Sequence, residues 1–276
     1  MNKKAVYGLY FVILFLLASL FLYPVFIVLI NSFKLKFSIS ASPFSLPTNE
    51  TFTGFENYIT GINSTDFLTS FFWSLFITVF SVAVIVIFTS MTAWYITRFK
   101  TAFNRIFYYL LIFSMIVPFQ MIMFTMSKIA NILALDNPIG LIFLYLGFGS
   151  GLSVFILSGG VLGVPKTIEE AALIDGCSTF SLFWRVVFPI LKPTAVTVAI
   201  LNTMWVWNDY LLPFLVIGND YKTIPIAVQY LKGGYGSVDM GALMALLMLS
   251  VIPVIIFYIS CQKFIIKGVA EGAVKG

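Results

Sequence analysis

The sequence predicts an all-α, polytopic membrane protein with six transmembrane helices and both termini in the cytoplasm. Of its 276 residues, 60% are hydrophobic and only 10% are charged, whereas soluble domains are about half apolar and about a quarter charged. The mean hydropathy of +1.02 agrees. So few polar residues cannot cover a globule, so lipid must be the solvent for much of this chain.

Six apolar stretches are long enough to cross a bilayer, whose core of about 30 Å needs about 20 helical residues. The predicted spans cover approximately residues 6–30, 71–96, 107–126, 139–162, 195–217 and 241–264. The first follows Lys3 and Lys4 and resembles a signal peptide. Its apolar run is too long for one and no small-residue cleavage site closes it, so a retained helix is expected.

Lysine and arginine between the spans set the orientation. With both termini inside, the inner segments hold eleven of these residues and the outer segments five. Six acidic residues fall in the outer loops, at Glu50, Glu56, Asp66, Asp136, Asp220 and Asp239. Both termini are therefore predicted to be cytoplasmic.

The composition also excludes several functions. Without histidine there is no Ser–His–Asp or Cys–His catalysis and no imidazole relay, and Cys177 and Cys261 are too few for a disulfide framework. The basic residues form no patch with interleaved aromatics, which argues against nucleic acid. Residues 160–167 come near a Walker A loop, but Pro165 replaces its second glycine and removes a backbone N–H. The chain is not expected to hydrolyse ATP or to act as an enzyme.

Two outer segments, residues 31–70 and 218–240, are long. The first is rich in Ser, Thr, Asn and Pro, and the second contains the flexible stretch 232–237 with one aromatic residue. Each can be a contact site for an extracytoplasmic partner or a solvated linker. The residues by themselves favour the linker.

The cytoplasmic segment 163–193 has a different character. A capping box is predicted, with Thr167 as the N-cap and Glu170 reaching back, in a helix that ends at Asp175 and a left-handed Gly176. A second short helix, capped by Ser178 or Thr179, should follow and end at Pro189, with the fifth span starting at Pro193. It carries an apolar face of Phe180, Phe183, Trp184 and Val187. The pattern predicts a rigid helix–turn–helix that fits a socket on another protein.

Residues 170–176, Glu-Ala-Ala-Leu-Ile-Asp-Gly, with Phe183, Pro189 and Pro193 downstream, resemble the EAA loop of binding-protein-dependent ABC importer permeases. Residues 207–210, Trp-Asn-Asp-Tyr, resemble a motif of sugar permeases, and residues 223–226 and 234–236 resemble the outer loop that follows it. Residues 272–276 resemble the C-terminal end of the maltose-permease type. The resemblance implies a single permease domain over 1–276: a first span and outer loop (1–70), a core (71–265) and a cytoplasmic tail (266–276).

The resemblance also implies roles for particular residues. The coupling helix that docks in a groove of the ATPase comprises Glu170, Ala171, Ala172, Asp175 and Gly176. The tail with Lys275 and Gly276 reaches the ATPase, and the loop with Gly233, Gly234, Tyr235 and Gly236 enters the binding protein.

The implied partners are a second, different permease subunit, two copies of an ATPase that uses ATP and Mg, and an extracytoplasmic sugar-binding protein. All would assemble in the inner membrane of a bacterial or archaeal cell, with no cofactor or metal on this chain. The ligand class implied is a di- or oligosaccharide or a glycerol-phosphate-like compound.

Polar residues within spans are costly and so are usually functional or paired. The candidates for a substrate pathway are Gln120, Asn202, Trp205, Asn208 and Asp209. Helix packing is an equally good account of them. Glycines at 147, 149, 151, 159 and 163 predict close helix packing. The competing functions are a secondary transporter or channel not coupled to ATP, and a membrane enzyme. Neither needs the predicted cytoplasmic helix–turn–helix of residues 163–193, which we call the knob.

Overall fold

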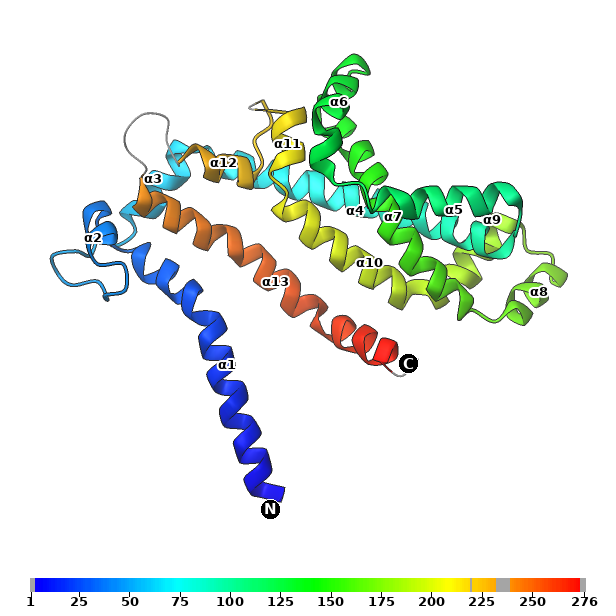
Figure 1. Ribbon diagram of the computed structural model, residues 1–276, viewed down its shortest axis with the longest axis horizontal. Coiled ribbons are helices and arrows are strands. Elements are labelled where there is room, and N and C mark those ends of the chain that lie inside the picture. The colour runs from blue at the N-terminus through cyan, green and yellow to red at the C-terminus, as the bar shows by residue number, and fades with distance from the viewer. Residues whose placement is uncertain (1–2, 219, 232–238, 274–276) are drawn as a thin grey trace. The chain divides into compact units, whose positions relative to one another are not determined.

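The computed structural model describes residues 3–218, 220–231 and 239–273 (Figure 1). The helices of this part are α1 (Lys3–Asn31), α2 (Lys36–Ala41), α3 (Glu56–Ser64), α4 (Phe67–Arg98), α5 (Ala102–Ser114), α6 (Phe119–Ile132), α7 (Pro138–Leu162), α8 (Lys166–Ile174), α9 (Thr179–Leu182), the π-helical turn η1 (Phe183–Val187), α10 (Phe188–Asn208), α11 (Leu211–Val216), α12 (Ile224–Tyr230) and α13 (Met240–Ala273). Two compact units divide the chain. The first comprises Met1–Leu68 and Ala227–Ile255, and the second comprises Thr69–Ile226 and Ile256–Gly276.

The all-α, polytopic class is confirmed. In the described residues, five helical runs are long and apolar enough to span a membrane: Tyr7–Asn31, Phe67–Arg98, Pro138–Leu162, Thr179–Asn208 and Met240–Phe264. The bent pair α5 and α6 makes a sixth if it counts as one span.

The predicted third span over residues 107–126 is not one continuous helix. α5 ends at Ser114, α6 begins at Phe119, and the two are bent by 107°. Pro118 stands at the N-cap of α6. It has no backbone N–H, and its ring steers the residue before it away from helical geometry. The apolar run of the sequence hides this break because hydropathy does not register backbone geometry.

The expected stop at Pro189 is wrong, and the fifth span, predicted over 195–217, instead covers Thr179–Asn208. α9, η1 and α10 form one run of 30 residues, Thr179–Asn208, in which Pro189 and Pro193 both lie. The Phe188 N–H donates to the carbonyl of Phe183, five residues back. A π turn of this kind widens the helix just before Pro189, whose ring would clash with a carbonyl four residues back. At the other end Asp209 is extended, and the chain resumes as α11.

The second unit is packed around α7, and three of its glycines make that packing possible. An added Cβ would stand 2.8 Å from Ile85 at Gly149, 2.6 Å from the Leu111 carbonyl oxygen at Gly151, and 2.7 Å from Thr194 at Gly160. Gly147 and Gly159 have no neighbour within 4 Å of that position. The predicted close packing is therefore confirmed for Gly149 and Gly151, whereas Gly147 and Gly159 are exposed and pack against nothing in the described part of the chain. Gly160 was not among the predicted positions.

In the first unit, the predicted outer segment is folded. The Asn57 side chain donates to the carbonyls of Ser32 and Lys34, both at 2.9 Å. The Lys34 side chain is only 1% exposed, and its Nζ donates to the Ser42 carbonyl at 3.0 Å. Burial lowers the pKa of Lys34. These hydrogen bonds hold the segment together internally, whereas a solvated linker lacks such contacts.

Candidate functional site

The helix α8 lies in the second unit, next to α9 and η1 (Figure 1). Its N-cap is Pro165, with no side-chain cap, so the predicted capping box of Thr167 and Glu170 is wrong. The helix begins at Lys166, so Thr167 already lies inside its first turn and does not cap it.

The predicted end of α8 is confirmed. Gly176 has φ +85°, and its N–H donates to the Leu173 carbonyl, while the Cys177 N–H donates to the Ala172 carbonyl. These two bonds are the Schellman pattern, which needs a left-handed residue and so favours glycine. The chain then turns sharply into α9, where Ser178 caps the helix as predicted, accepting from the Ser181 N–H.

The two sides of α8 differ in exposure. Glu170, Ala171, Asp175 and Gly176 are exposed, together with Ile174, whose side chain is 86% exposed. Ala172 is half-buried and packs against the buried cluster that includes Trp94, Val161 and Phe183. Of the five predicted coupling residues, four therefore face outward and one helps to seat the helix.

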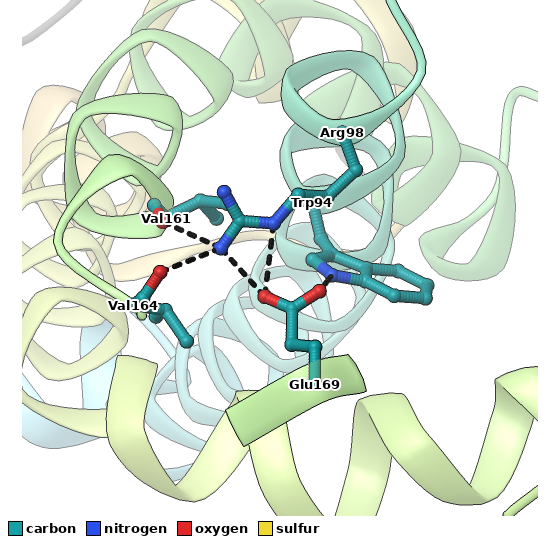
Figure 2. Close-up of polar contacts among 5 residues, drawn as sticks. All are labelled: Trp94, Arg98, Val161, Val164 and Glu169. Carbon is teal, nitrogen blue, oxygen red and sulfur yellow. Dashed lines mark hydrogen bonds and ion pairs between the residues drawn. The ribbon is translucent and has the colours of Figure 1, made fainter. Parts of the chain in front are cut away.

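The neighbouring Glu169 is buried, with 6% of it exposed. Figure 2 shows its carboxylate meeting two side chains of α4: Arg98 Nε and Nη2 donate to Oε1 at 2.9 and 2.5 Å, and the Trp94 indole N–H donates to Oε2 at 3.0 Å. We call Trp94, Arg98 and Glu169 the clasp. The sequence by itself singled out none of these three residues. The available signal was an arginine at the end of an apolar span, where a buried charge requires a partner.

The clasp also reaches the end of α7. Arg98 Nη2 donates to the carbonyls of Val161 and Val164, at 3.1 and 2.8 Å. The last carbonyls of a helix have no partner within it, and a cation there is favourable. One guanidinium therefore joins three segments: the end of α4, the end of α7 and the first turns of α8.

The predicted pathway residue Asn202 is buried in the packing of α10 against α7. Its Nδ2 donates to Ser153 Oγ at 3.0 Å and to the Val198 carbonyl at 2.9 Å. Of the two accounts left open by the sequence, these contacts favour helix packing.

Two other predicted residues are brought together by Tyr145, which the sequence did not single out. The Tyr145 hydroxyl donates to Asp209 Oδ2 at 3.0 Å, and its ring stands edge-on to Trp205 at 5.3 Å between centroids. Asp209 Oδ1 also accepts from the Leu211 N–H and so starts α11. Trp205 keeps 40% of its surface exposed.

Gln120 and Asn208 are exposed. Asn208 donates to the Met204 carbonyl one turn back on its own helix. The pathway role of all five residues stays a prediction.

The family of binding-protein-dependent transport system inner membrane components matches residues 86–271, and this match covers most of the chain. The chain belongs to this family. The resemblance drawn from the EAA loop is thereby confirmed, and this inner membrane component is a multi-pass membrane protein.

Two relatives agree over nearly their full length. This inner membrane component is 39% identical to the probable starch degradation products transport system permease protein AmyC of Thermoanaerobacterium thermosulfurigenes, over 94% of this chain and 93% of the relative. It is 35% identical to the multiple sugar-binding transport system permease protein MsmG of Streptococcus mutans, over 99% of both chains.

The fold is similar to that of a chain in the crystal structure of a bacterial ABC transporter involved in the import of the acidic polysaccharide alginate. The TM-score is 0.77 at 23% identity, over 95% of this chain and 98% of that one. At this identity the likeness concerns the fold.

Some predicted sites of this inner membrane component remain predictions. Gly233, Gly234, Tyr235 and Gly236, expected to contact a binding protein, and Lys275 and Gly276, expected to contact the ATPase, lie outside the described residues. Across the described part of the chain, no group of three or more Cys, Asp or Glu side chains is arranged to hold a metal ion.

Proposed function

We propose that this chain is the transmembrane subunit of an ATP-driven, binding-protein-dependent sugar importer, and that α8 receives the movement of the ATPase. Family membership supports the importer role, and the similarity to AmyC and MsmG supports a carbohydrate substrate. One observation supports the coupling role: buried contacts hold one side of α8, which we call its inner side, and charged and apolar side chains are exposed on the opposite side, which we call its outer side.

The outer side of α8 suits a protein groove. Ala171 has a short side chain, so a partner backbone can approach closely, and the carboxylates of Glu170 and Asp175 can accept hydrogen bonds from basic or backbone donors. Ile174 and Leu173 are 86% and 50% exposed, so a partner that covers them gains apolar burial.

In the proposed cycle, this chain and a second permease subunit line the pathway, and each contacts one of two ATPase subunits. Closure of the ATPases on ATP and Mg displaces α8 and favours the outward-facing state. The shift requires that the ATPase contacts differ in free energy between the two states. A sugar-binding protein then releases its ligand into the pathway, aided by the loop of Gly233, Gly234, Tyr235 and Gly236, while Lys275 and Gly276 reach the ATPase.

Among the pathway candidates, we propose Trp205 as the one that meets sugar. Its ring is held edge-on by Tyr145 and remains partly exposed, and aromatic faces suit the apolar faces of a neutral saccharide. Asn202 is assigned to helix packing instead.

The coupling proposal is tested with Glu170→Lys and Gly176→Pro in the complete importer. Both variants should reach the membrane, but should co-purify with little ATPase and take up little of the ligand of the cognate binding protein. Glu50→Lys, the same charge change at an exposed position of an outer segment, is the matched control and should behave as wild type. Unchanged ATPase association and uptake in both α8 variants would show that α8 is not the coupling element.

A further inference from the structure

We propose that the clasp of Trp94, Arg98 and Glu169 is the device that makes α8 and the transmembrane helices move as one body, so that its loss uncouples ATP hydrolysis from transport without undocking the ATPase. This proposal rests on the proposed function of α8. It assigns a positioning role to residues that face away from the expected ATPase contact.

Glu169 and Glu170 are neighbours with opposite surroundings. Glu170 is exposed, whereas Glu169 is buried and points to α4, 71 residues earlier in the chain. A carboxylate taken out of water is stable only with charged or hydrogen-bonding partners. Here Oε1 accepts from the guanidinium and Oε2 from the indole, so both oxygens are satisfied by α4 alone.

The clasp strengthens the attachment of α8 to α4 and α7, which is otherwise weak at the start of α8. Only residues 163–165 connect α7 to α8, and no side chain caps the start of α8. Arg98 bonds the Val161 and Val164 carbonyls as well as Glu169, so it holds both sides of this connection. Without the guanidinium, α8 could swing on a three-residue hinge.

Trp94 also contacts the second helical segment of the knob, at η1. Its ring packs against Phe183 at 5.5 Å between centroids, and Phe183 is the first residue of η1, which joins α9 to α10 in the continuous run. Trp94 therefore contacts α8 through its N–H and the α10 run through its ring. A force on α8 must either displace α4, α7 and α10 together or break a buried ion pair.

The mechanical consequence is specific. Docking depends on the outer side of α8, which the clasp does not touch, whereas transmission depends on the inner side. Clasp variants should therefore retain the ATPase but transmit its movement poorly.

The test uses the full importer in proteoliposomes, with the ratio of ligand taken up to ATP hydrolysed as the readout. Arg98→Ala, which removes all four guanidinium bonds, and Glu169→Gln, which removes the charge of the acceptor, should both co-purify with wild-type amounts of ATPase. The ratio should fall about tenfold in Glu169→Gln, the scale of one weakened charge-assisted hydrogen bond, and at least as far in Arg98→Ala. Stimulation of ATP hydrolysis by the loaded binding protein should fall in parallel. Arg98→Lys, which keeps the charge but not the fork, should recover part of the ratio.

Two further variants keep the test decisive. Arg105→Ala removes an exposed cation of α5 outside the clasp and should leave the ratio unchanged. Trp94→Phe keeps an aromatic ring at this position but removes the N–H donor and some buried volume, while the Arg98–Glu169 pair stays, so it should reduce the ratio less than Arg98→Ala. If Arg98→Ala fails to accumulate, Glu169→Gln and Trp94→Phe decide the question.

The outcomes separate the two proposals. A wild-type ratio in Glu169→Gln and Trp94→Phe overturns the clasp proposal. Loss of ATPase association in these variants, as expected for Glu170→Lys, also overturns it, because the clasp would then only shape the docking helix. Normal association in Glu170→Lys would instead refute the proposed function of α8.

Discussion

The glycines of α7 offer a sharp test of the packing in the second unit, since Gly147 and Gly151 lie one turn apart on the same helix. Replacing glycine by alanine inside a helix stabilises it by about 1 kcal/mol when the methyl group meets nothing. Gly147 is such a position. Gly147→Ala should therefore leave the stability of the protein unchanged or raise it slightly.

Gly151→Ala should do the opposite. Its Cβ would stand 2.6 Å from the Leu111 carbonyl oxygen, 2.7 Å from Met115 Cγ and 2.9 Å from Ser114 Oγ. An ordinary contact begins at 3.4 Å, so α5 must retreat by about 0.8 Å from 2.6 Å. Because Leu111 O belongs to the backbone, no side-chain rotation relieves the clash. Overpacking of this kind costs about 1–3 kcal/mol, which leaves a net loss of about 0–2 kcal/mol after the helix gain.

The assay is thermal unfolding of the purified importer in detergent, followed by tryptophan fluorescence and by retention of a monodisperse gel-filtration peak. The midpoint for Gly151→Ala should lie several degrees below that for Gly147→Ala. Gly160→Ala should fall between them, because the Thr194 and Leu191 side-chain atoms near its Cβ can move. Equal midpoints for Gly151→Ala and Gly147→Ala would refute the close approach of α5 and α7 described above.

Two further predictions concern the polar residues of α10. Asn202→Leu should lower the unfolding midpoint, since it leaves the buried Ser153 hydroxyl without its donor at a cost of about 1–3 kcal/mol, whereas exposed Asn208→Leu should change the midpoint little; a comparable loss in both would contradict the packing role. Trp205→Ala should raise the KM for uptake severalfold while ATPase association stays normal, with Tyr145→Phe as a milder variant that loses only the bond of about 1 kcal/mol to Asp209. An unchanged KM in transport assays of Trp205→Ala would remove Trp205 from the pathway.

Much of the fold could be predicted because the relevant properties are local. A run of about 20 apolar residues must be helical in lipid wherever it lies, since its backbone groups have no water to bond. The end of α8 was predictable for the same reason: the left-handed turn at Gly176 depends on the lack of a Cβ at one position. The family motif of residues 170–176 also lies within one short segment.

The incorrect helix boundaries in the third and fifth spans have a cause that is not local in the sequence. Pro118 breaks the third span and Pro189 leaves the run into α10 continuous, although both prolines stand in apolar surroundings. The π turn at η1 accommodates the second proline, and the residues that open and close this turn, Phe183 and Val187, are both buried in the packed core. Local propensity ranks proline as a helix breaker and does not contain that packing.

The sequence by itself determined that this is a helical membrane protein of the binding-protein-dependent transport family, with an exposed helix ending at Gly176. Only the tertiary structure decided which of two adjacent glutamates faces outward and which is held inside. That choice depends on Arg98 and Trp94, which the chain brings to Glu169 from a helix far earlier in the sequence. Burial of a charge is a property of its surroundings in space, so it becomes visible only when the partner side chains are in place.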